Sequence, residues 1–296
     1  MRIAFLGFGL ISGSVARALR GAADPAWRHA HLVAWTPSGM GPTRGVADGV
    51  LDAAADEPSA AVVGANLVVL GAPPLAVLQL IDALGGSLRD ALWPGAVVTD
   101  VASTKSMIVA AANRAGLRFV GGHPMAGRER SGFEAATPGL FADRPWIVTP
   151  GATAEPSDTV LVEDLARACG ATPLRMSADE HDAATAGISH LPLVAAVALV
   201  EAVAGVAAEE RPGWPAAERL AAGGWRDMTR LARGDVALGT GIAVTNPVQL
   251  AARIRALRAE LDEWLAELEQ DGGPDPERLA ARFRAARDRL ERAGQR

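Results

Sequence analysis

The first 176 residues alternate short apolar runs with stretches of helical periodicity. The runs predicted to form strands are Arg2–Leu6, His31–Trp35, Leu67–Gly71, Ala96–Asp100, Arg118–Val120, Trp146–Thr149 and Ala171–Arg175. The helices predicted between them are Ser12–Arg20, Leu75–Leu84, Lys105–Ala115 and Ser157–Cys169. This alternation favours an α/β fold of the Rossmann type, a doubly wound and mostly parallel sheet with helices on both faces.

The β signal ends after Ser177, and the rest of the chain predicts helices alone. The predicted breaks between these helices lie at Arg211–Trp214, Gly223–Gly224, Asn246–Pro247 and Asp271–Pro276. We therefore predict two domains, residues 1–176 with the sheet and residues 177–296 all helical. Ligands of such a sheet bind beyond the carboxyl ends of its strands, where a second domain can close the cleft.

The most apolar later stretch, Leu191–Ala208, is interrupted by Pro192, Glu201 and Gly205. These interruptions and its many alanines favour a buried helix over a membrane span. A helical domain this apolar is also expected to bury surface against a second subunit. We predict a homodimer.

The composition excludes several classes of partner. The 296 residues carry a net charge of −5 without a block of Lys or Arg, which argues against nucleic acid or an anionic membrane as the main partner. The lone Cys169 forms no intramolecular disulfide and fits a reducing cytoplasm. Glycines interrupt the apolar N-terminus, so we expect no signal peptide. No Cys/His cluster has metal-ligand spacing, and no metal is predicted.

The first predicted strand runs directly into a glycine-rich turn and then a helix, which is the context of a dinucleotide fingerprint. Gly7 permits the tight turn and Gly9 lets a pyrophosphate approach the backbone. The helix that starts near Leu10 and Ile11 stabilises the phosphate charge, because its first N–H groups and dipole point at the ligand. Ser12 occupies the third glycine position, with Gly13 beside it.

The choice between the two nicotinamide cofactors depends on the end of the second strand. No carboxylate is present there to bind a ribose 2′-hydroxyl, but Thr36 and Ser38 could bond a hydroxyl or a 2′-phosphate, and Arg44 is the nearest cation. NADP is therefore slightly favoured and NAD is not excluded. Ala72 and Pro73, which follow the third predicted strand, are further candidate cofactor-binding residues.

A second chemical signal is the segment G-G-H-P-M-A-G-R-E-R-S-G, residues 121–132. We predict a glycine-punctuated loop that presents the imidazole of His123. An alcohol that becomes a ketone needs a base near neutral pH, and an imidazole with a pKa of about 6.5 suits that task. Glu129 could orient or gate the loop. His181 is expected to be a helix-start residue, and His29 and His31 are expected at the surface or in a strand.

Three more segments could face the nicotinamide: residues 100–105 (D-V-A-S-T-K), 189–192 (S-H-L-P) and 223–230 (G-G-W-R-D-M-T-R). With the fingerprint, the His123 segment and W-I-V-T-P at residues 146–150, they resemble the prephenate/arogenate dehydrogenase family of tyrosine biosynthesis over nearly the whole chain. The resemblance implies oxidative decarboxylation of a cyclohexadienol, in which hydride leaves C4 for the nicotinamide and the C1 carboxylate departs as carbon dioxide.

The resemblance also implies roles for particular residues. His123 matches the family's catalytic base, Ser103 its hydroxyl-orienting serine and Arg230 its carboxylate-binding arginine, whose fork can bond both oxygens. His190 and Gly223, with Glu129, complete the predicted substrate-binding set. Ser103 as a plain helix cap, Arg230 as an ordinary ion-pair partner and His190 as a satisfied helix-start group remain open alternatives.

Two departures from the family pattern leave the substrate open. Leu193 stands where the family often has a second His, and Gly239 where a Trp is common. Both positions line the end of the pocket that holds the substrate side chain, so prephenate, arogenate and 4-amino-4-deoxyprephenate all remain candidates.

Two other functions compete with this one. A different two-domain hydroxy-acid dehydrogenase would need a lysine from the second domain, yet Lys105 is the only lysine of the chain. A non-catalytic dinucleotide-sensing regulator would need neither His123 nor Arg230.

Overall fold

The structure is a computed structural model that describes residues 1–128, 130–206 and 209–294. It consists of two compact units, Met1–Leu250 and Ala251–Arg296. The first unit holds the sheet and the helices that follow it. The second holds most of one long helix and the C-terminal helix.

One eight-stranded sheet forms the centre of the first unit, in the order β3-β2-β1-β4-β5-β6-β7-β8. Its strands are β1 (Arg2–Leu6), β2 (His31–Trp35), β3 (Ala53–Ala54), β4 (Leu67–Leu70), β5 (Val97–Asp100), β6 (Phe119–Pro124), β7 (Pro145–Pro150) and β8 (Thr172–Arg175). Every neighbouring pair is parallel except β6 and β7. The predicted doubly wound, mostly parallel sheet is confirmed, and the strand order reverses beside β1, where such sheets bind ligands.

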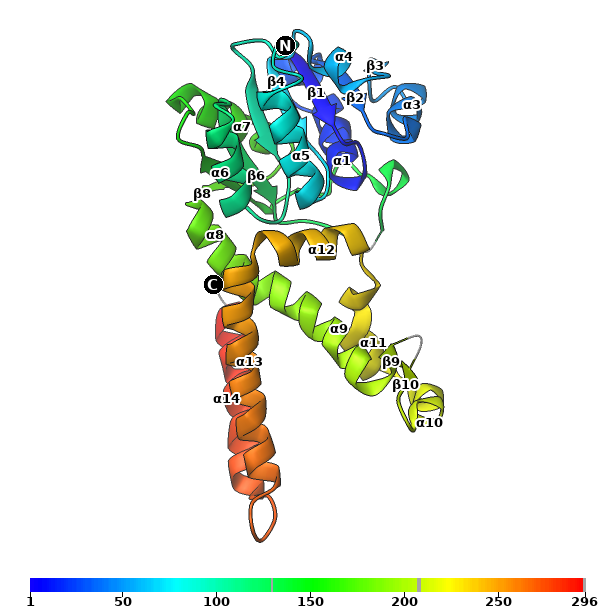
Figure 1. Ribbon diagram of the computed structural model, residues 1–296, viewed down its shortest axis with the longest axis vertical. Helices are drawn as coiled ribbons and strands as arrows, with labels where there is room; N and C mark the ends of the chain where they lie inside the picture. Colours follow the sequence, from blue (N-terminus) through cyan, green and yellow to red (C-terminus); the bar gives the residue numbers. More distant parts are fainter. Residues whose placement is uncertain (129, 207–208, 295–296) are drawn as a thin grey trace. The chain divides into compact units, whose positions relative to one another are not determined.

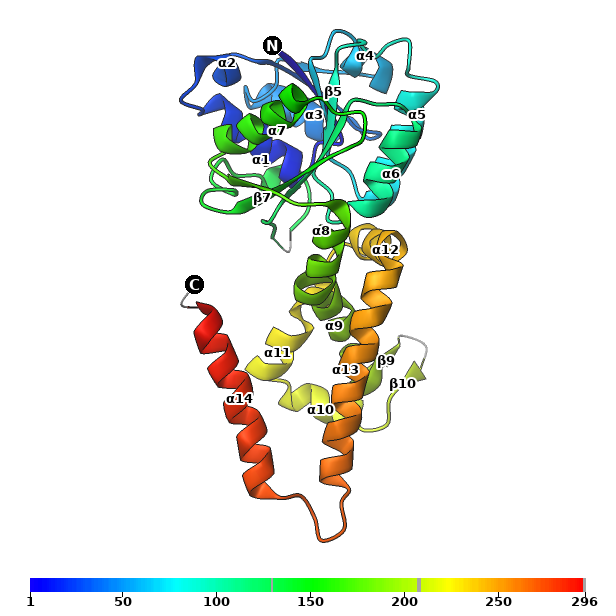
Figure 2. The same ribbon diagram turned by 90° about the vertical axis from the view of Figure 1, so that its left-hand side faces the viewer.

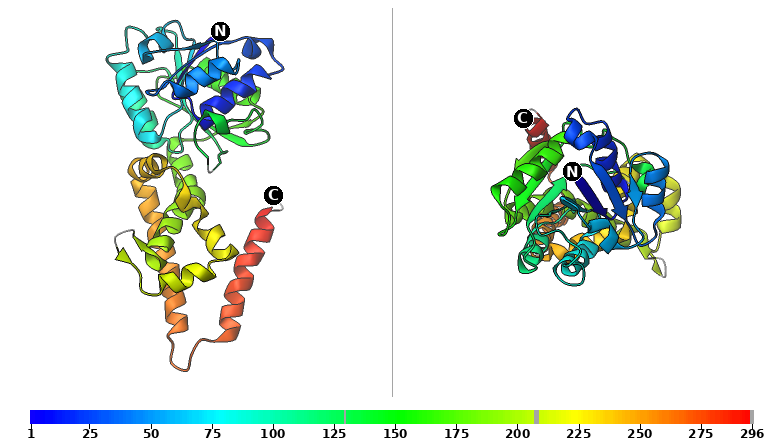
Figure 3. Two further views of the ribbon diagram at one scale, coloured as in Figure 1. Left: turned by 90° about the vertical axis from the view of Figure 1, so that its right-hand side faces the viewer. Right: turned by 90° about the horizontal axis from the view of Figure 1, so that it is seen from above.

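Helices cover both faces of the sheet (Figures 2 and 3). They are α1 (Leu10–Arg20), α2 (Pro25–Arg28), α3 (Met40–Ala47), α4 (Pro58–Val62), α5 (Pro74–Gly85), α6 (Ser106–Arg114) and α7 (Pro156–Ala168). Val15 of α1 and Val162 of α7 belong to one buried apolar cluster, whereas Ile81 of α5 and Ile108 of α6 belong to another. The two clusters are the two layers of core that an open parallel sheet requires.

Beyond Ser177 the chain is almost entirely helical (Figure 1). The elements are α8 (Ala178–Thr185), the π-helical turn η2 (Ala186–His190), α9 (Leu191–Val203), α10 (Trp214–Leu220), α11 (Gly223–Thr229), the 3₁₀ turn η3 (Arg230–Arg233), α12 (Val236–Thr245), α13 (Pro247–Leu268) and α14 (Pro276–Gly294). The prediction of helices alone is wrong at one place, where β9 (Gly205–Val206) pairs with β10 (Glu209–Glu210). Gly205 has a φ of +86°, which ends the helix and turns the chain into the hairpin.

The apolar helix α9 is not buried as the sequence predicts. Ala196 is its only buried residue, and Val197 and Val203 are each 38% exposed. The helical stretch Ala178–Val203 is long and apolar enough to cross a membrane by length and composition alone. The remainder of the predicted segment, residues 207–208, lies outside the described residues.

In the second unit, two long helices pack through an aromatic contact. The rings of Trp264 on α13 and Phe283 on α14 are 5.3 Å apart, and the Arg282 guanidinium lies 4.5 Å from the centre of the Trp264 ring. Several large apolar side chains of this unit stay exposed within one chain: Ile254, Leu261, Leu265, Leu268, Phe283 and Leu290.

A buried ion pair lies just beyond β5 in the first unit. Lys105 and Asp100 are both fully buried, and the Lys105 ammonium donates to the Asp100 carboxylate. The same carboxylate accepts the backbone N–H groups of Ala102 and Gly122, each at 3.0 Å. Burial lowers the pKa of Lys105, and the charge of Asp100 opposes that effect.

Removing one partner leaves the other charge buried and uncompensated. We expect Lys105→Met and Asp100→Asn each to lower the free energy of unfolding by about 3–5 kcal/mol in urea denaturation. The matched control is Arg44→Met at the ion pair between Arg44 and Asp48, whose Arg44 side chain is 62% exposed, and it should change stability little. A Lys105→Met protein as stable as the control variant would contradict this account.

Candidate active site

The glycine turn between β1 and α1 has the geometry of a phosphate cradle. Gly7 has a φ of +95° and donates its N–H to the Trp35 carbonyl at 2.9 Å. A Cβ on Gly7 would lie 2.4 Å from the Gly71 carbonyl oxygen, so the turn admits no side chain there. Gly9 is the N-cap of α1, and a Cβ built on it would face open space.

Among the described residues, no side chain caps the N-terminus of α1. Its first turn, which includes Leu10 and Ile11, holds no acidic residue. The free N–H groups therefore point to the carboxyl edge of the sheet, between β1 and β4, and fit the pyrophosphate of a dinucleotide. Ala72 and Pro73 follow β4 at this edge, and Pro73 is the N-cap of α5.

Gly13 has a different neighbour. A Cβ on it would lie 2.7 Å from the ring of Phe133, in the 3₁₀ turn η1 (Phe133–Ala135). Phe133 also stacks on Phe8 and lies under the guanidinium of Arg17. The absent side chain at Gly13 thus lets the segment after β6 pack directly on the cofactor helix.

The hydroxyls predicted to bind the cofactor's ribose follow β2. The Thr36 hydroxyl accepts the N–H of Gly39 at 3.1 Å, and the Ser38 hydroxyl accepts that of Met40 at 3.4 Å. Ser38 and Arg44 line one open groove, together with residues of α3. The Arg44 guanidinium on α3 bonds Asp48, the C-cap of the same helix, at 3.0 Å.

His123 does not lie in a loop, contrary to the prediction. Strand β6 runs to Pro124 and pairs antiparallel with β7, with His123 opposite Ile147. A Cβ on Gly122 would lie 2.6 Å from the Asp100 carbonyl oxygen, so the glycine allows β6 to continue beside β5 where any other residue would clash. The imidazole is buried at the end of a rigid strand, which positions it better than a loop would.

The imidazole of His123 contacts His181, which the sequence predicts only as a helix-start residue. His123 Nδ1 and His181 Nε2 are 2.7 Å apart, and His181 Nδ1 lies 2.8 Å from Asp182 Oδ1. His181 does lie in the first turns of α8, as predicted, but it is 1% exposed. In the sequence, the acidic residues before His181 indicate only the start of a helix.

Asp182 connects this pair to the segment after β5. Its two carboxylate oxygens accept the backbone N–H groups of Lys105 and Ser106, each at 2.8 Å. No side chain of α6 caps its own N-terminus, so Asp182 supplies the cap from another helix. Thr104 and Thr245 add a buried hydroxyl contact of 2.7 Å between this segment and α12.

His190 reaches the same region because the helix is irregular. His190 lies nine positions after His181, a spacing that would place the two on opposite faces of a regular α-helix. The π-helical turn η2 lies between them, just before Pro192, which has no N–H to continue the regular ladder. His190 Nδ1 lies 3.2 Å from Asn246 Nδ2, and the Asn246 amide donates to the Asp182 carbonyl at 2.9 Å.

The environment keeps the imidazoles of His123 and His190 neutral. Burial holds the pKa of His123 well below its usual value, and the charge of Lys105 lowers it further. Burial also lowers the pKa of His190, against the charge of Asp182 and a hydrogen bond with the Ser103 backbone. A neutral, buried imidazole at pH 7 can accept a proton from a bound alcohol.

The structure assigns the predicted site residues to several elements. Ser103, His123 and His190 share the cluster just described. Gly223 and Arg230 are exposed on α11 and η3, which pack against α9. Glu129 lies outside the described residues. A Cβ on Gly239 would lie 3.7 Å from a methyl group of Leu193, so the two departures from the family pattern are neighbours.

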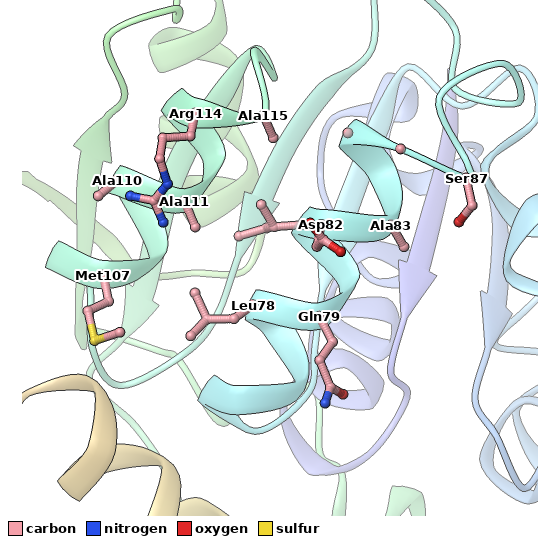
Figure 4. Close-up of a pocket in the computed structure, with 13 residues that line it drawn as sticks. Leu78, Gln79, Asp82, Ala83, Ser87, Met107, Ala110, Ala111, Arg114 and Ala115 are labelled. Carbon is pink, nitrogen blue, oxygen red and sulfur yellow. The ribbon is translucent and has the colours of Figure 1, made fainter.

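An open groove lies elsewhere in the first unit, between α5 and α6 (Figure 4). Leu78, Asp82, Met107 and Arg114 line it, and none of the predicted site residues does. Among the described residues, no group of three or more His, Cys, Asp or Glu side chains could hold a metal ion.

Two family models match the chain. One, the prephenate dehydrogenase nucleotide-binding domain, matches residues 32–174, and the other, the prephenate dehydrogenase dimerization domain, matches residues 177–285. The prephenate dehydrogenase of Bacillus subtilis is 32% identical over 289 residues, which cover 97% of this chain and 74% of that protein.

Two crystal structures share the fold. Synechocystis arogenate dehydrogenase is 30% identical with a TM-score of 0.76, and the match covers 98% of this chain and 100% of that one. The prephenate dehydrogenase of A. aeolicus, in complex with hydroxyphenyl propionate and NAD⁺, has a TM-score of 0.83 at 24% identity, with 98% of each chain covered. The resemblance drawn from the sequence motifs is confirmed: this chain is an NAD(P)-dependent dehydrogenase and belongs to the prephenate dehydrogenase family.

Proposed function

We propose that this protein converts prephenate to 4-hydroxyphenylpyruvate and carbon dioxide, with His123 as the catalytic base and NADP or NAD as the hydride acceptor. The observation that carries the proposal is a neutral imidazole buried at the end of β6, in the same sheet whose β1 and β4 flank the phosphate cradle. The name of the Bacillus subtilis relative supports prephenate as the substrate.

The residues act on the substrate's ring alcohol. His123 Nε2 accepts the proton as the O–H bond breaks, and Ser103 holds the hydroxyl in position. NAD(P), when bound, supplies the acceptor for the hydride that leaves C4. The electron pair of the bond from C1 to the carboxylate then makes the ring aromatic, carbon dioxide leaves, and the proton on His123 returns to the phenolate oxygen.

Arogenate is the second candidate substrate, and 4-amino-4-deoxyprephenate is a third. The solved arogenate dehydrogenase from Synechocystis favours arogenate. Leu193 and Gly239 place an apolar side chain and a hydrogen together at the proposed side-chain end of the pocket. Neither can donate a hydrogen bond to a second carboxylate from its side chain.

The first prediction concerns activity. Wild-type protein should reduce cofactor at 340 nm with prephenate, and His123→Asn should lower kcat by roughly 10² to 10⁴. Because the pKa of His123 is depressed, kcat/KM should hold steady above pH 6.5 and fall only at lower pH, where the imidazole gains a proton. A His123→Asn variant within a few-fold of wild type would remove the proposed base.

The same assay compares the cofactors and the substrates. We expect a higher kcat/KM with NADP than with NAD, because no carboxylate follows β2 and Arg44 lines the groove beside Ser38. A strong preference for NAD would overturn that expectation. Parallel assays with arogenate and 4-amino-4-deoxyprephenate decide between the candidate substrates.

Arg230 is proposed to bind the substrate's ring carboxylate, with His190, Gly223 and Glu129 completing the substrate site. A guanidinium that holds the carboxylate stabilises the ground state more than the departing neutral carbon dioxide. Arg230→Ala should therefore raise KM more than it lowers kcat in steady-state kinetics. The reverse pattern would refute this role.

We also propose that residues 1–176 hold the cofactor, and that residues 177–296 bind the substrate and a second copy of the chain. The match of residues 32–174 to a nucleotide-binding domain and of residues 177–285 to a dimerization domain supports this division. The exposed apolar side chains of α9 and α13 support a homodimer, since such surfaces usually mark an interface. A cytoplasmic location, without nucleic acid or membrane as partner, completes the proposal.

The dimer has a direct test. Light scattering at micromolar concentration should give about twice the chain mass of 30.5 kDa. Leu261→Glu with Leu265→Glu, on exposed positions of α13, should reduce the dimer fraction because a charge in an apolar interface costs desolvation. A monomeric mass for the wild-type protein would contradict the homodimer.

A further inference from the structure

Three buried side chains form a continuous hydrogen-bonded chain behind the proposed base. His123 comes from β6, and His181 and Asp182 come from α8, 58 residues further along the sequence. His181 and Asp182 are each 1% exposed. Neither is needed to bind the cofactor in the scheme above, so their burial as polar groups requires another reason.

The hydrogen bonds determine where each proton lies. The backbone N–H groups of Lys105 and Ser106 both donate to the Asp182 carboxylate. Burial alone would raise the pKa of Asp182, but these bonds and the one from His181 hold it below its usual value. An ionised carboxylate only accepts hydrogen bonds, so the hydrogen between His181 and Asp182 must be on His181 Nδ1.

This assignment extends to the next ring. In the arrangement proposed here His181 carries its single hydrogen on Nδ1, and its Nε2 accepts from the next ring. His123 Nδ1, 2.7 Å away, is then the donor, and His123 Nε2 is left without a hydrogen. That nitrogen is the one that can take a proton from a substrate.

The charges around the two imidazoles bear on the protonation state of His123. In the part of the chain that the structure describes, the titratable and charged groups that face the two imidazoles are the ion pair of Lys105 with Asp100 at the end of β5, Asp182 on α8 and His190 at the end of η2. Of these, Asp182 is the one carboxylate bonded directly to the pair. It can therefore stabilise a positive charge that forms on His123 only through His181.

We propose that His181 and Asp182 are positioning residues that hold His123 in the tautomer with a free Nε2 and stabilise the imidazolium formed when that nitrogen takes the substrate's hydroxyl proton. The inference rests on the proposed function for the identity of the proton donor. One O–H bond breaks and one N–H bond forms at His123 Nε2. During this step the proton goes no further than His123, and Asp182 remains a carboxylate throughout.

The test begins without any substrate. The chain has five histidines, so nitrogen-15 labelling of histidine gives a resolvable NMR spectrum of ring nitrogens. Wild-type His123 should show a protonated Nδ1 and an unprotonated Nε2 at pH 7. In His181→Phe, which keeps the ring but removes the acceptor, the His123 hydrogen should redistribute to Nε2. A wild-type spectrum with the hydrogen on Nε2 would overturn the proposal.

Kinetics supply the second readout. A wrong tautomer at a catalytic histidine lowers kcat by up to about 10⁴ in a Ser-His-Asp triad, so His181→Phe should lose on the order of 10² to 10⁴ in kcat with little change in KM. His181→Gln, whose amide oxygen can still accept from His123 Nδ1, should recover part of that loss. The exposed His29 provides the control, and His29→Gln should match wild type.

The pH profile separates positioning from simple folding damage. In the proposed arrangement His181 Nε2 accepts from His123 Nδ1 and helps to stabilise the imidazolium, so replacing His181 by Phe should move the acid limb of kcat/KM to lower pH. An unchanged acid limb with kcat within a few-fold of wild type would refute the inference. If the wild type turned over none of the three candidate substrates, the proposed function would fail, while the NMR result would still decide the tautomer. Should His181→Phe not fold, His181→Gln and the wild-type spectrum carry the test.

Discussion

The carboxylate of Asp182 connects helix α8 to both the segment after β5 and the imidazole pair. It caps the N-terminus of α6, where the helix dipole favours a negative charge, and it accepts a hydrogen bond from His181. One side chain of the helical region thereby fixes both the segment after β5 and the ring behind His123. The arrangement suits a dehydrogenase, because His123 must keep a fixed position relative to the strand ends that hold the cofactor.

Missing side chains are as important as present ones at the carboxyl edge of the sheet. Gly7 approaches the Gly71 carbonyl, and Gly122 approaches the Asp100 carbonyl, at distances that exclude a Cβ. Because these backbones pack so closely, the glycine turn after β1 and the imidazole of His123 both lie on rigid elements. Gly13 extends the same principle, since Phe133 occupies the space of its side chain and ties the segment after β6 to the cofactor helix.

The sequence predicted the sheet well because parallel strands buried on both faces read as uninterrupted apolar runs. It missed short elements such as β3, and it ended β6 at Val120 because Gly and Pro are rare in strands. Only pairing with β7 extends that strand to His123. The burial predicted for α9 also failed, since hydrophobicity predicts that a surface is covered without saying that the same chain covers it.

Local pattern alone determined the strand, turn and helix of the cofactor site, and it singled out His123 as the residue with chemistry to perform. These features depend on residues within one or two turns of each other, so spacing is enough to find them. The roles of His181, Asp182, Lys105 and Asn246 were decided by the tertiary structure, which unites β5, β6, α8 and α12 around one polar cluster. Contacts between residues 58 to 77 positions apart have no periodic signature, because they arise when whole elements pack and buried polar groups must find partners.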